Sequence, residues 1–262
     1  GQTRTLRLAL TASSTMLKLG LDRREKFFAS ILEKFGGNLK YIICGGAPLD
    51  PCYIKEFRAM GIDLMLGYGI TECSPIVSVN ASLNGRRAAD ETVGWTFPSV
   101  EVKIDQPDYT GSGEVLVRGD NVMMGYYNDP YSTADVFTDG WFRTGDLGHL
   151  NKDGSLTITG RKKNLIILSN GENVSPEEIE YQLARIPEIK EVVVYTEGNL
   201  IVAEIFPEEN EMTDADLKAV LQERINDYNA HQPSHKRVNK VKIRKNEFEK
   251  TTTHKIKRYK VL

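Results

Sequence analysis

Cysteine and histidine, the residues that build disulfide frameworks and most transition-metal centres, are scarce in this sequence. It has three cysteines and four histidines among 262 residues, and no two cysteines form a CxxC pair. An odd number of widely spaced cysteines argues against a disulfide scaffold and is typical of a reducing compartment. The histidines show no metal-ligand spacing either. We therefore expect a cytoplasmic protein without a structural metal.

A long hydrophobic run and a secretory leader are also lacking. No stretch of about 18 consecutive apolar residues is present, which excludes an ordinary membrane-spanning helix. Residues 1–11 do not combine a basic start, an apolar core and a cleavage site, so no signal peptide is predicted. Because the first residue is Gly1 and not methionine, we expect a processed end or a piece of a longer protein.

Charge is nearly balanced in total but is unevenly distributed along the chain. The formal net charge is −2, and the 27% charged and 40% hydrophobic residues exclude a disordered or low-complexity chain. Residues 164–235 contain four basic and fifteen acidic residues, whereas residues 236–262 contain eleven basic and two acidic ones. Such a basic tail can bind nucleic acid, bind phosphate groups, or pair with acidic residues of the same chain.

The first 85 residues show the rhythm of a parallel α/β unit. Apolar residues recur at helical spacing at the start of the chain, and Gly36 and Gly37 end that helical region. An apolar strand over residues 41–44, a glycine loop, a helix over 51–60 and a buried strand over 63–66 follow. In such folds the binding site lies at the carboxyl ends of the strands.

From about residue 86 the pattern changes to short alternating runs between turns, which predict antiparallel strands of a small barrel or a curled sheet. Later, a Ser-Pro-Glu-Glu capping box at 175–178, a hairpin and a second capped helix predict a compact α+β domain. We therefore predict a multidomain α/β and α+β protein with the boundary at Lys163. Its parts are residues 1–162, divided into a parallel α/β part (1–85) and a β-rich part (86–160), and residues 163–262.

The segment 67–72, Gly-Tyr-Gly-Ile-Thr-Glu, combines backbone freedom with polar side chains. Its two glycines let the backbone approach a flat ligand on which the ring of Tyr68 can stack. Thr71 and Glu72 add a hydroxyl and a carboxylate, the groups that hold a phosphate and its Mg²⁺. The alternative interpretation is a glycine-rich turn with a tyrosine in the core.

Further along the chain, an acid and two groups of basic residues also fit a nucleotide site. Asp146 follows Thr-Gly at the end of an aromatic strand, where an acid can accept hydrogen bonds from both hydroxyls of a ribose. Taken alone, such an aspartate is more often a turn residue. Residues 160–163 are Gly-Arg-Lys-Lys, and Lys255 lies on a threonine-rich loop as a mobile point charge suited to a phosphoryl or carboxylate oxygen.

Six motifs of this sequence resemble, in their order, the core motifs of the adenylate-forming superfamily. That family includes acyl-CoA synthetases, firefly luciferase and the adenylation domains of peptide synthetases. The motifs are Gly-Gly-Ala-Pro (45–48), Gly-Tyr-Gly-Ile-Thr-Glu (67–72), Gly-Tyr-Tyr-Asn-Asp-Pro (125–130), Arg-Thr-Gly-Asp (143–146), Gly-Arg-Lys-Lys (160–163) and Thr-x-x-His-Lys-Ile-x-Arg (251–258). Residues 71–75 and 171–176 look most like those of bacterial long-chain fatty acyl-CoA synthetases.

The resemblance implies a ligase that uses ATP, Mg²⁺ and CoA to convert a fatty acid to acyl-AMP and then to a thioester. The chain would form the rear part of the family's large adenylate-binding domain and its small mobile C-terminal domain, with the hinge at Lys163. The residues that would bind the nucleotide or CoA are Gly45, Gly46, Ala47, Gly67, Tyr68, Gly69, Thr71, Asp146, Arg161 and Gly171.

Within that set, the resemblance implies separate roles for the adenosine-binding residues. Gly46 and Ala47 would border the adenine, and the ring of Tyr68 would stack on it. Asp146, helped by Arg161, would hold the ribose.

The remaining roles concern the phosphate and CoA. Thr71 would contact the α-phosphate, and Glu72 would bind Mg²⁺. Lys255 would stabilise the charge that builds up when the carboxylate attacks the α-phosphorus, and Gly171 would meet the pantetheine arm of CoA.

The sequence also departs from the family pattern. The family's phosphate loop, rich in Ser, Thr and Gly and ending in Pro-Lys, does not occur before Leu39. We therefore expect a catalytically incomplete chain that forms no acyl-CoA when isolated. Leu66 stands where a polar residue is common, and His254 stands where glycine is usual.

Two other functions remain open at this point. An acyl ligase of this kind can use a separate carrier protein instead of CoA as the acceptor. A non-catalytic module can use the basic tail to bind nucleic acid or anionic lipid, but no aromatic residues are interleaved with the basic ones as in a stacking platform. We therefore expect no nucleic-acid partner, and leave open a peripheral membrane association and the oligomeric state.

Overall fold

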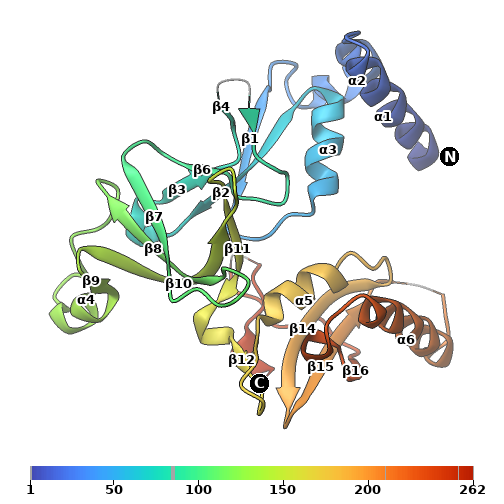
Figure 1. Ribbon diagram of the computed structural model, residues 1–262. Helices are drawn as coiled ribbons and strands as arrows, with labels where there is room; N and C mark the ends of the chain where they lie inside the picture. Colours follow the sequence, from blue (N-terminus) through green and yellow to red (C-terminus); the bar gives the residue numbers. More distant parts are fainter. Residues whose placement is uncertain (1, 84–85, 210, 253, 262) are drawn as a thin grey trace. The chain divides into compact units, whose positions relative to one another are not determined.

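The computed structural model describes residues 2–83, 86–209, 211–252 and 254–261. It divides into two compact units (Figure 1). The first unit comprises the chain up to Thr144 together with Gly148–Ile158. The second comprises Gly145–Leu147 and the chain from Thr159 onward. Within the described residues, no helix combines the length and the apolar character needed to cross a membrane.

Helices occupy the start of the first unit, as the periodicity predicts. The region contains two helices, α1 (Gln2–Lys18) and α2 (Arg24–Lys34), which pack on α3 (Pro51–Met60) through buried residues such as Leu10 and Phe28. Helix α2 ends at Lys34, and after its C-cap residue Phe35 come Gly36 and Gly37, both of which have positive φ. Asp50 is the N-cap residue of α3. Its side chain accepts a hydrogen bond from the Cys52 backbone N–H at 2.8 Å.

The predicted parallel strand pair is confirmed. Strand β1 (Tyr41–Gly45) lies parallel to β2 (Asp63–Gly69), and β3 (Ile76–Val79) and β6 (Trp95–Thr96) complete a sheet of order β1-β2-β3-β6. Buried Leu64 and Leu66 of β2 pack on Ile54 of α3. Strand β1 is apolar but is the edge strand, so Tyr41 and Ile43 are exposed. Strand β2 extends beyond the predicted end at residue 66 and carries Gly67–Gly69 within the sheet.

The β-rich part forms short antiparallel strands, as predicted. Strands run in the order β11-β10-β8-β7, with β9 paired to β10, in an open path that corresponds to a half-barrel. The core beneath them includes fully buried Val115, Val117 and Leu156. The bounds are β4 (Ser82–Leu83), β5 (Arg86–Arg87), β7 (Val100–Asp105), β8 (Gly113–Gly119), α4 (Pro130–Val136), β9 (Phe137–Thr138), β10 (Trp141–Leu150) and β11 (Leu156–Arg161).

The second unit is an α+β structure around a three-stranded sheet. Strand β14 (Ile189–Glu197) forms the predicted hairpin with β15 (Leu200–Pro207), and β16 (Lys240–Ile243) lies parallel to β15. Helix α5 (Pro176–Leu183) and helix α6 (Asp214–Ala230) contribute buried residues to this sheet's core, among them Leu183 and Leu221. The small strands β12 (Ile166–Ile167) and β13 (Asn173–Val174) and the 3-10 turns η1 (Thr71–Cys73), η2 (Lys162–Asn164), η3 (Ser234–Lys236) and η4 (Arg258–Lys260) complete the described elements.

One local expectation is wrong: the capping box at 175–178 does not form. Helix α5 begins at Pro176, but the side chain of Ser175 makes no capping hydrogen bond. Its hydroxyl donates instead to the backbone carbonyl of Thr159 at 2.7 Å. A Cβ at Gly160 would lie 2.1 Å from Ser175 Oγ, so β11 passes too close for a side chain there. The long-range contact with β11 therefore takes the hydroxyl away from the helix.

A close backbone approach at Gly69 gives a prediction for stability. A Cβ at this position would lie 1.9 Å from the backbone oxygen of Pro75, so Gly69→Ala must displace the backbone. We expect a loss of about 3 kcal/mol in the unfolding free energy of the first unit. Urea unfolding followed by tryptophan fluorescence measures it, because Trp95 and Trp141 both belong to this unit.

The matched control is Gly67→Ala in the same strand. There the added Cβ would meet a movable side chain, Ile43 Cγ2, at 3.2 Å. We expect this variant to lose no more than about 1 kcal/mol. Equal losses in the two variants would contradict the packing that the structure shows at Gly69.

Candidate functional site

Glycines of the two motifs lie side by side at the carboxyl ends of β1 and β2. Gly45 and Gly67 are direct partners across the two strands, and a Cβ at Gly45 would lie 2.9 Å from the Gly67 oxygen. Gly46 follows with a φ of 86°, a conformation that favours glycine, and Ala47 is exposed beside it. The structure thus brings together the two glycine-rich motifs, with Gly45 and Gly46 exposed.

Tyr68, which follows Gly67 in β2, lies in the core. Only 9% of its surface is exposed, and it belongs to the cluster that contains Cys73 and Val77. The stacking of Tyr68 on a base therefore stays a prediction, because only the small exposed part of this residue could contact a base. Burial, with a smaller contribution from Glu72, raises the pKa of the Cys73 thiol to about 11, so this cysteine is unsuited to act as a nucleophile.

The polar pair Thr71 and Glu72 lies on the 3-10 turn η1, directly after β2. The side chain of Thr71 is exposed, and that of Glu72 is half-buried. The hydroxyl of Tyr126 donates a hydrogen bond to Glu72 Oε1 at 3.0 Å, and the backbone N–H of Met123 donates to the Glu72 carbonyl at 2.8 Å. The sequence pattern indicates no separate role for Tyr126, although this residue lies in the motif at 125–130.

Glu72 could bind a Mg²⁺ ion as a single carboxylate ligand, without requiring further metal-binding side chains around it. Among the described residues, no three His, Cys, Asp or Glu side chains are grouped to hold a metal. Mg²⁺ commonly binds through one or two carboxylates, with waters and substrate phosphates completing its shell. Glu72 Oε2 has no hydrogen-bond partner in the part of the chain that the structure describes, so it could serve as such a single ligand.

In the second unit, Asp146 and Arg161 form an ion pair. Arg161 Nε lies 3.1 Å from Asp146 Oδ1. Asp146 is 4% exposed, whereas half of the Arg161 side chain is accessible. Gly145, with a φ of 70°, takes the left-handed conformation directly before the aspartate. These two residues, from motifs at 143–146 and 160–163, thus lie together as a nucleotide site would require.

Lys163 and Gly171 lie on exposed turns of the same unit. Lys163 is in the middle of η2, directly after β11. Gly171, with a φ of 81°, is in the turn between β12 and β13, where its N–H donates to the Leu168 carbonyl at 2.8 Å. Apart from its chain neighbours, no described atom lies within 4 Å of a Cβ placed on Gly171, and the residue is exposed.

The loop around Lys255 is held by its backbone. Thr251 N–H donates to the Lys255 carbonyl at 2.8 Å, and the Lys255 N–H donates to Thr251 Oγ1 at 3.1 Å. His254 has a φ of 59°, in the left-handed region that favours glycine. Thr253 of this motif lies outside the described residues. The exposed Lys255 ammonium has no partner among the described residues, so its charge is available.

Most other cations of the basic tail pair within the second unit. Arg258 bonds to Glu180, Arg244 to Glu204, and Lys236 to Glu178. Further pairs join Lys240 and Lys242 to Glu197, Lys250 to Glu191 and Glu247, and Lys257 and Lys260 to Glu249. Internal pairing, the third of the interpretations of this tail, is therefore what the structure shows, and it weakens the case for an anion-binding module.

Comparison with known protein families gives two matches, which cover two different segments of the chain. Residues 8–127 match the model of the AMP-binding enzymes, and residues 163–262 match the model of the AMP-binding enzyme C-terminal domain. The chain belongs to the adenylate-forming superfamily.

Individual relatives narrow the similarity further. The chain is 41% identical over 159 residues to the long-chain-fatty-acid–CoA ligase FadD15 of Mycobacterium bovis, with 61% of this chain and 25% of that protein covered. It is 39% identical over 188 residues to the indoleacetate–CoA ligase of Aromatoleum aromaticum, with 68% and 36% covered. The crystal structure of ATP-bound MatB from Rhodopseudomonas palustris matches with a TM-score of 0.72 and 25% identity, covering 90% of this chain and 48% of that one. The chain thus spans about a quarter to a half of these relatives.

Proposed function

We propose that the protein that contains this chain is an ATP-dependent ligase, which joins a long-chain fatty acid to CoA through an acyl-adenylate. The observation that carries this proposal is the meeting of the motif pairs: Gly45 beside Gly67, and Asp146 beside Arg161. The similarity to FadD15 supports the fatty acid as substrate. We also propose a cytoplasmic location, which the three free cysteines support.

In the first step, a carboxylate oxygen of the fatty acid bonds to the α-phosphorus of ATP, and the bond from that phosphorus to the pyrophosphate oxygen breaks. Negative charge increases around the phosphorus during this attack. The hydroxyl of Thr71 would donate to an α-phosphate oxygen, and Glu72 would hold Mg²⁺, which supplies positive charge to the phosphates. The ammonium of Lys255 would stabilise the same charge, and Asp146 with Arg161 would hold the ribose.

In the second step, the thiol of CoA loses its proton to water, its sulfur bonds to the acyl carbon, and AMP leaves with the electrons of the broken carbon–oxygen bond. Gly171 would accept the pantetheine arm, because no side chain of the described residues blocks its backbone. We propose Lys163 as the hinge at which the C-terminal domain, residues 163–262, rotates between the steps, as its exposed place on η2 would allow.

Exchange of labelled pyrophosphate into ATP tests this function and its substrate together. We expect the full-length protein that contains this sequence to catalyse exchange that depends on hexadecanoate, whereas the isolated 262 residues, predicted to be catalytically incomplete, should not serve as the test. Indoleacetate is the control acid, because one of the relatives is an indoleacetate–CoA ligase. Exchange that depends on indoleacetate and not on hexadecanoate would contradict the fatty-acid assignment, and exchange with neither acid would contradict the ligase.

A further inference from the structure

The loop that follows β8 binds Glu72 at two points. The Met123 N–H donates to the Glu72 backbone carbonyl at 2.8 Å, and the Tyr126 hydroxyl donates to Glu72 Oε1 at 3.0 Å. These contacts join residues more than fifty positions apart within the first unit. The carboxylate is therefore restrained through both the backbone and the side chain of its residue.

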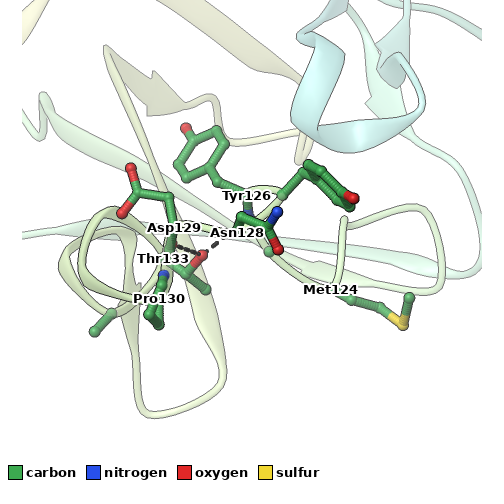
Figure 2. Close-up of a pocket in the computed structure, with 9 residues that line it drawn as sticks. Met124, Tyr126, Asn128, Asp129, Pro130 and Thr133 are labelled. Carbon is green, nitrogen blue, oxygen red and sulfur yellow. Dashed lines mark hydrogen bonds between the residues drawn. The ribbon is translucent and has the colours of Figure 1, made fainter.

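The first turn of α4 in turn fixes the position of Tyr126. The Tyr126 N–H donates to Thr133 Oγ1 at 2.9 Å, and Thr133 Oγ1 donates to the Asp129 carbonyl at 2.7 Å. Figure 2 shows Thr133 between Tyr126 and Asp129 with these bonds as dashed lines. Asp129 also caps the helix, because its Oδ1 accepts from the Ser132 N–H at 2.9 Å.

Gly125 shows that this arrangement needs a close approach. A Cβ at Gly125 would lie 2.8 Å from Thr133 Cγ2, and its φ of 153° lies in the region that favours glycine. Within the motif at 125–130, Gly125 and Asp129 therefore both help to hold Tyr126 in place.

The hydrogen bond leaves the two oxygens of Glu72 in different states. Oε1 accepts from Tyr126, whereas Oε2 has no protein partner in the described part of the chain. A donor that fixes one oxygen of a carboxylate also fixes the direction in which the other oxygen points.

We propose that Tyr126 is a positioning residue: its hydroxyl holds Glu72 Oε1 so that Oε2 is directed at a divalent cation. This inference rests on the proposed function, in which Glu72 is the Mg²⁺ ligand. If Tyr126 only stabilised the fold, its loss would change stability and not the affinity for a metal.

Mn²⁺ binding separates these possibilities, with Tyr127→Phe as the matched control. Tyr127 is the next residue, is 93% exposed, and has no partner among the described residues. We expect Tyr126→Phe to weaken Mn²⁺ binding about tenfold, as loss of a residue that orients a metal ligand usually does. Electron paramagnetic resonance of the free Mn²⁺ measures the affinity. Tyr127→Phe should leave it unchanged, and Glu72→Gln should abolish binding at this site.

The experiment distinguishes a failure of the positioning role of Tyr126 from a failure of the metal role of Glu72. Binding that Glu72→Gln abolishes and Tyr126→Phe leaves unchanged would overturn the positioning role alone. Binding that Glu72→Gln leaves unchanged would overturn the metal role of Glu72 in the proposed function.

A second readout does not depend on the folding of the Tyr126→Phe variant. In the wild-type protein labelled with [13Cζ]tyrosine, Mn²⁺ should broaden the Tyr126 signal more than the Tyr127 signal, and Glu72→Gln should remove the difference. Equal broadening of the two signals would also overturn the proposal.

Discussion

Replacing Arg258 by methionine is expected to lower the unfolding free energy of the second unit by about 4 kcal/mol at pH 8. The guanidinium of Arg258 donates from Nη1 to both oxygens of Glu180, at 2.5 and 2.7 Å, and from Nη2 to the Val194 carbonyl at 2.8 Å. Glu180 Oε1 also accepts from the Val194 N–H at 2.6 Å. The pair therefore ties the C-terminal tail to α5 and β14, and the variant leaves a buried carboxylate without its cation.

The cost of this variant should depend on pH. Burial raises the pKa of Glu180 from 4.5 to about 7, although Arg258 acts in the opposite direction. A carboxyl with a raised pKa stabilises the folded state when protonated, so its contribution is present below pH 4.5 and is lost as the pH rises through 7. Without Arg258 that pKa rises further. The loss in Arg258→Met should therefore be smaller at pH 5, where Glu180 is neutral, than at pH 8.

Hydrogen exchange of the amides of β14 and β15 measures this stability, because both tryptophans belong to the first unit. Lys240→Met is the control, since it removes an exposed ion pair with Glu197 that we expect to contribute less than about 1 kcal/mol. A pH-independent loss, or a loss no larger than that of Lys240→Met, would contradict the account of the buried pair.

Replacing Lys255 by alanine is expected to slow the adenylation step by about 10²- to 10³-fold, the usual effect of removing one group that stabilises charge in a transition state. The loop backbone around Lys255 is hydrogen-bonded, whereas its ammonium has no partner in the described chain, so the variant removes a charge and little structure. Fatty-acid-dependent pyrophosphate exchange measures the step.

Lys245→Ala is the matched control for this prediction. Lys245 is also an exposed lysine of the basic tail without a partner among the described residues, but it lies outside the motif at 251–258. Its replacement should leave exchange unchanged. Equal loss in the two variants would mean that the positive charge of the tail in general, and not Lys255, supports the reaction.

The sequence predicted the local elements of the first unit well, because their signals are local. The bounds of α3, Pro51–Met60, follow from a capping aspartate, a proline at the first helical position and Gly61 after the end. The parallel pairing of β1 and β2 follows from the strand–helix–strand rhythm. The meeting of Gly45 with Gly67 was a consequence of that topology.

Long-range contacts could not be predicted in the same way. Ser175 has the right neighbours for a capping box, yet its hydroxyl bonds to Thr159 of a distant strand. The role of Tyr126 depends on its contact with Glu72, which no spacing reveals. The exposure of β1 depends on its place at the sheet edge, whereas its apolar sequence suggested burial. In each case a tertiary contact, or the lack of one, outweighed the local pattern.

The charges of the basic tail show the same limit. The count of basic residues allowed three interpretations, and only the positions of Glu178, Glu180 and Glu204 show that the charges pair internally. The structure adds that Lys255 differs from most of its neighbours in having no partner among the described residues.

Binding of a non-hydrolysable acyl-adenylate analogue tests the central claim most directly. Titration calorimetry with the purified protein should show saturable binding, and Asp146→Ala should weaken it at least about a hundredfold, because two hydrogen bonds from the ribose to a charged acceptor are lost. Asp146→Asn, which keeps the shape of the buried side chain, should also weaken binding, and exposed Asp120→Ala should not. Binding that is unchanged in folded Asp146→Asn, or absent in the wild type, would contradict the claim that this chain holds an adenylate.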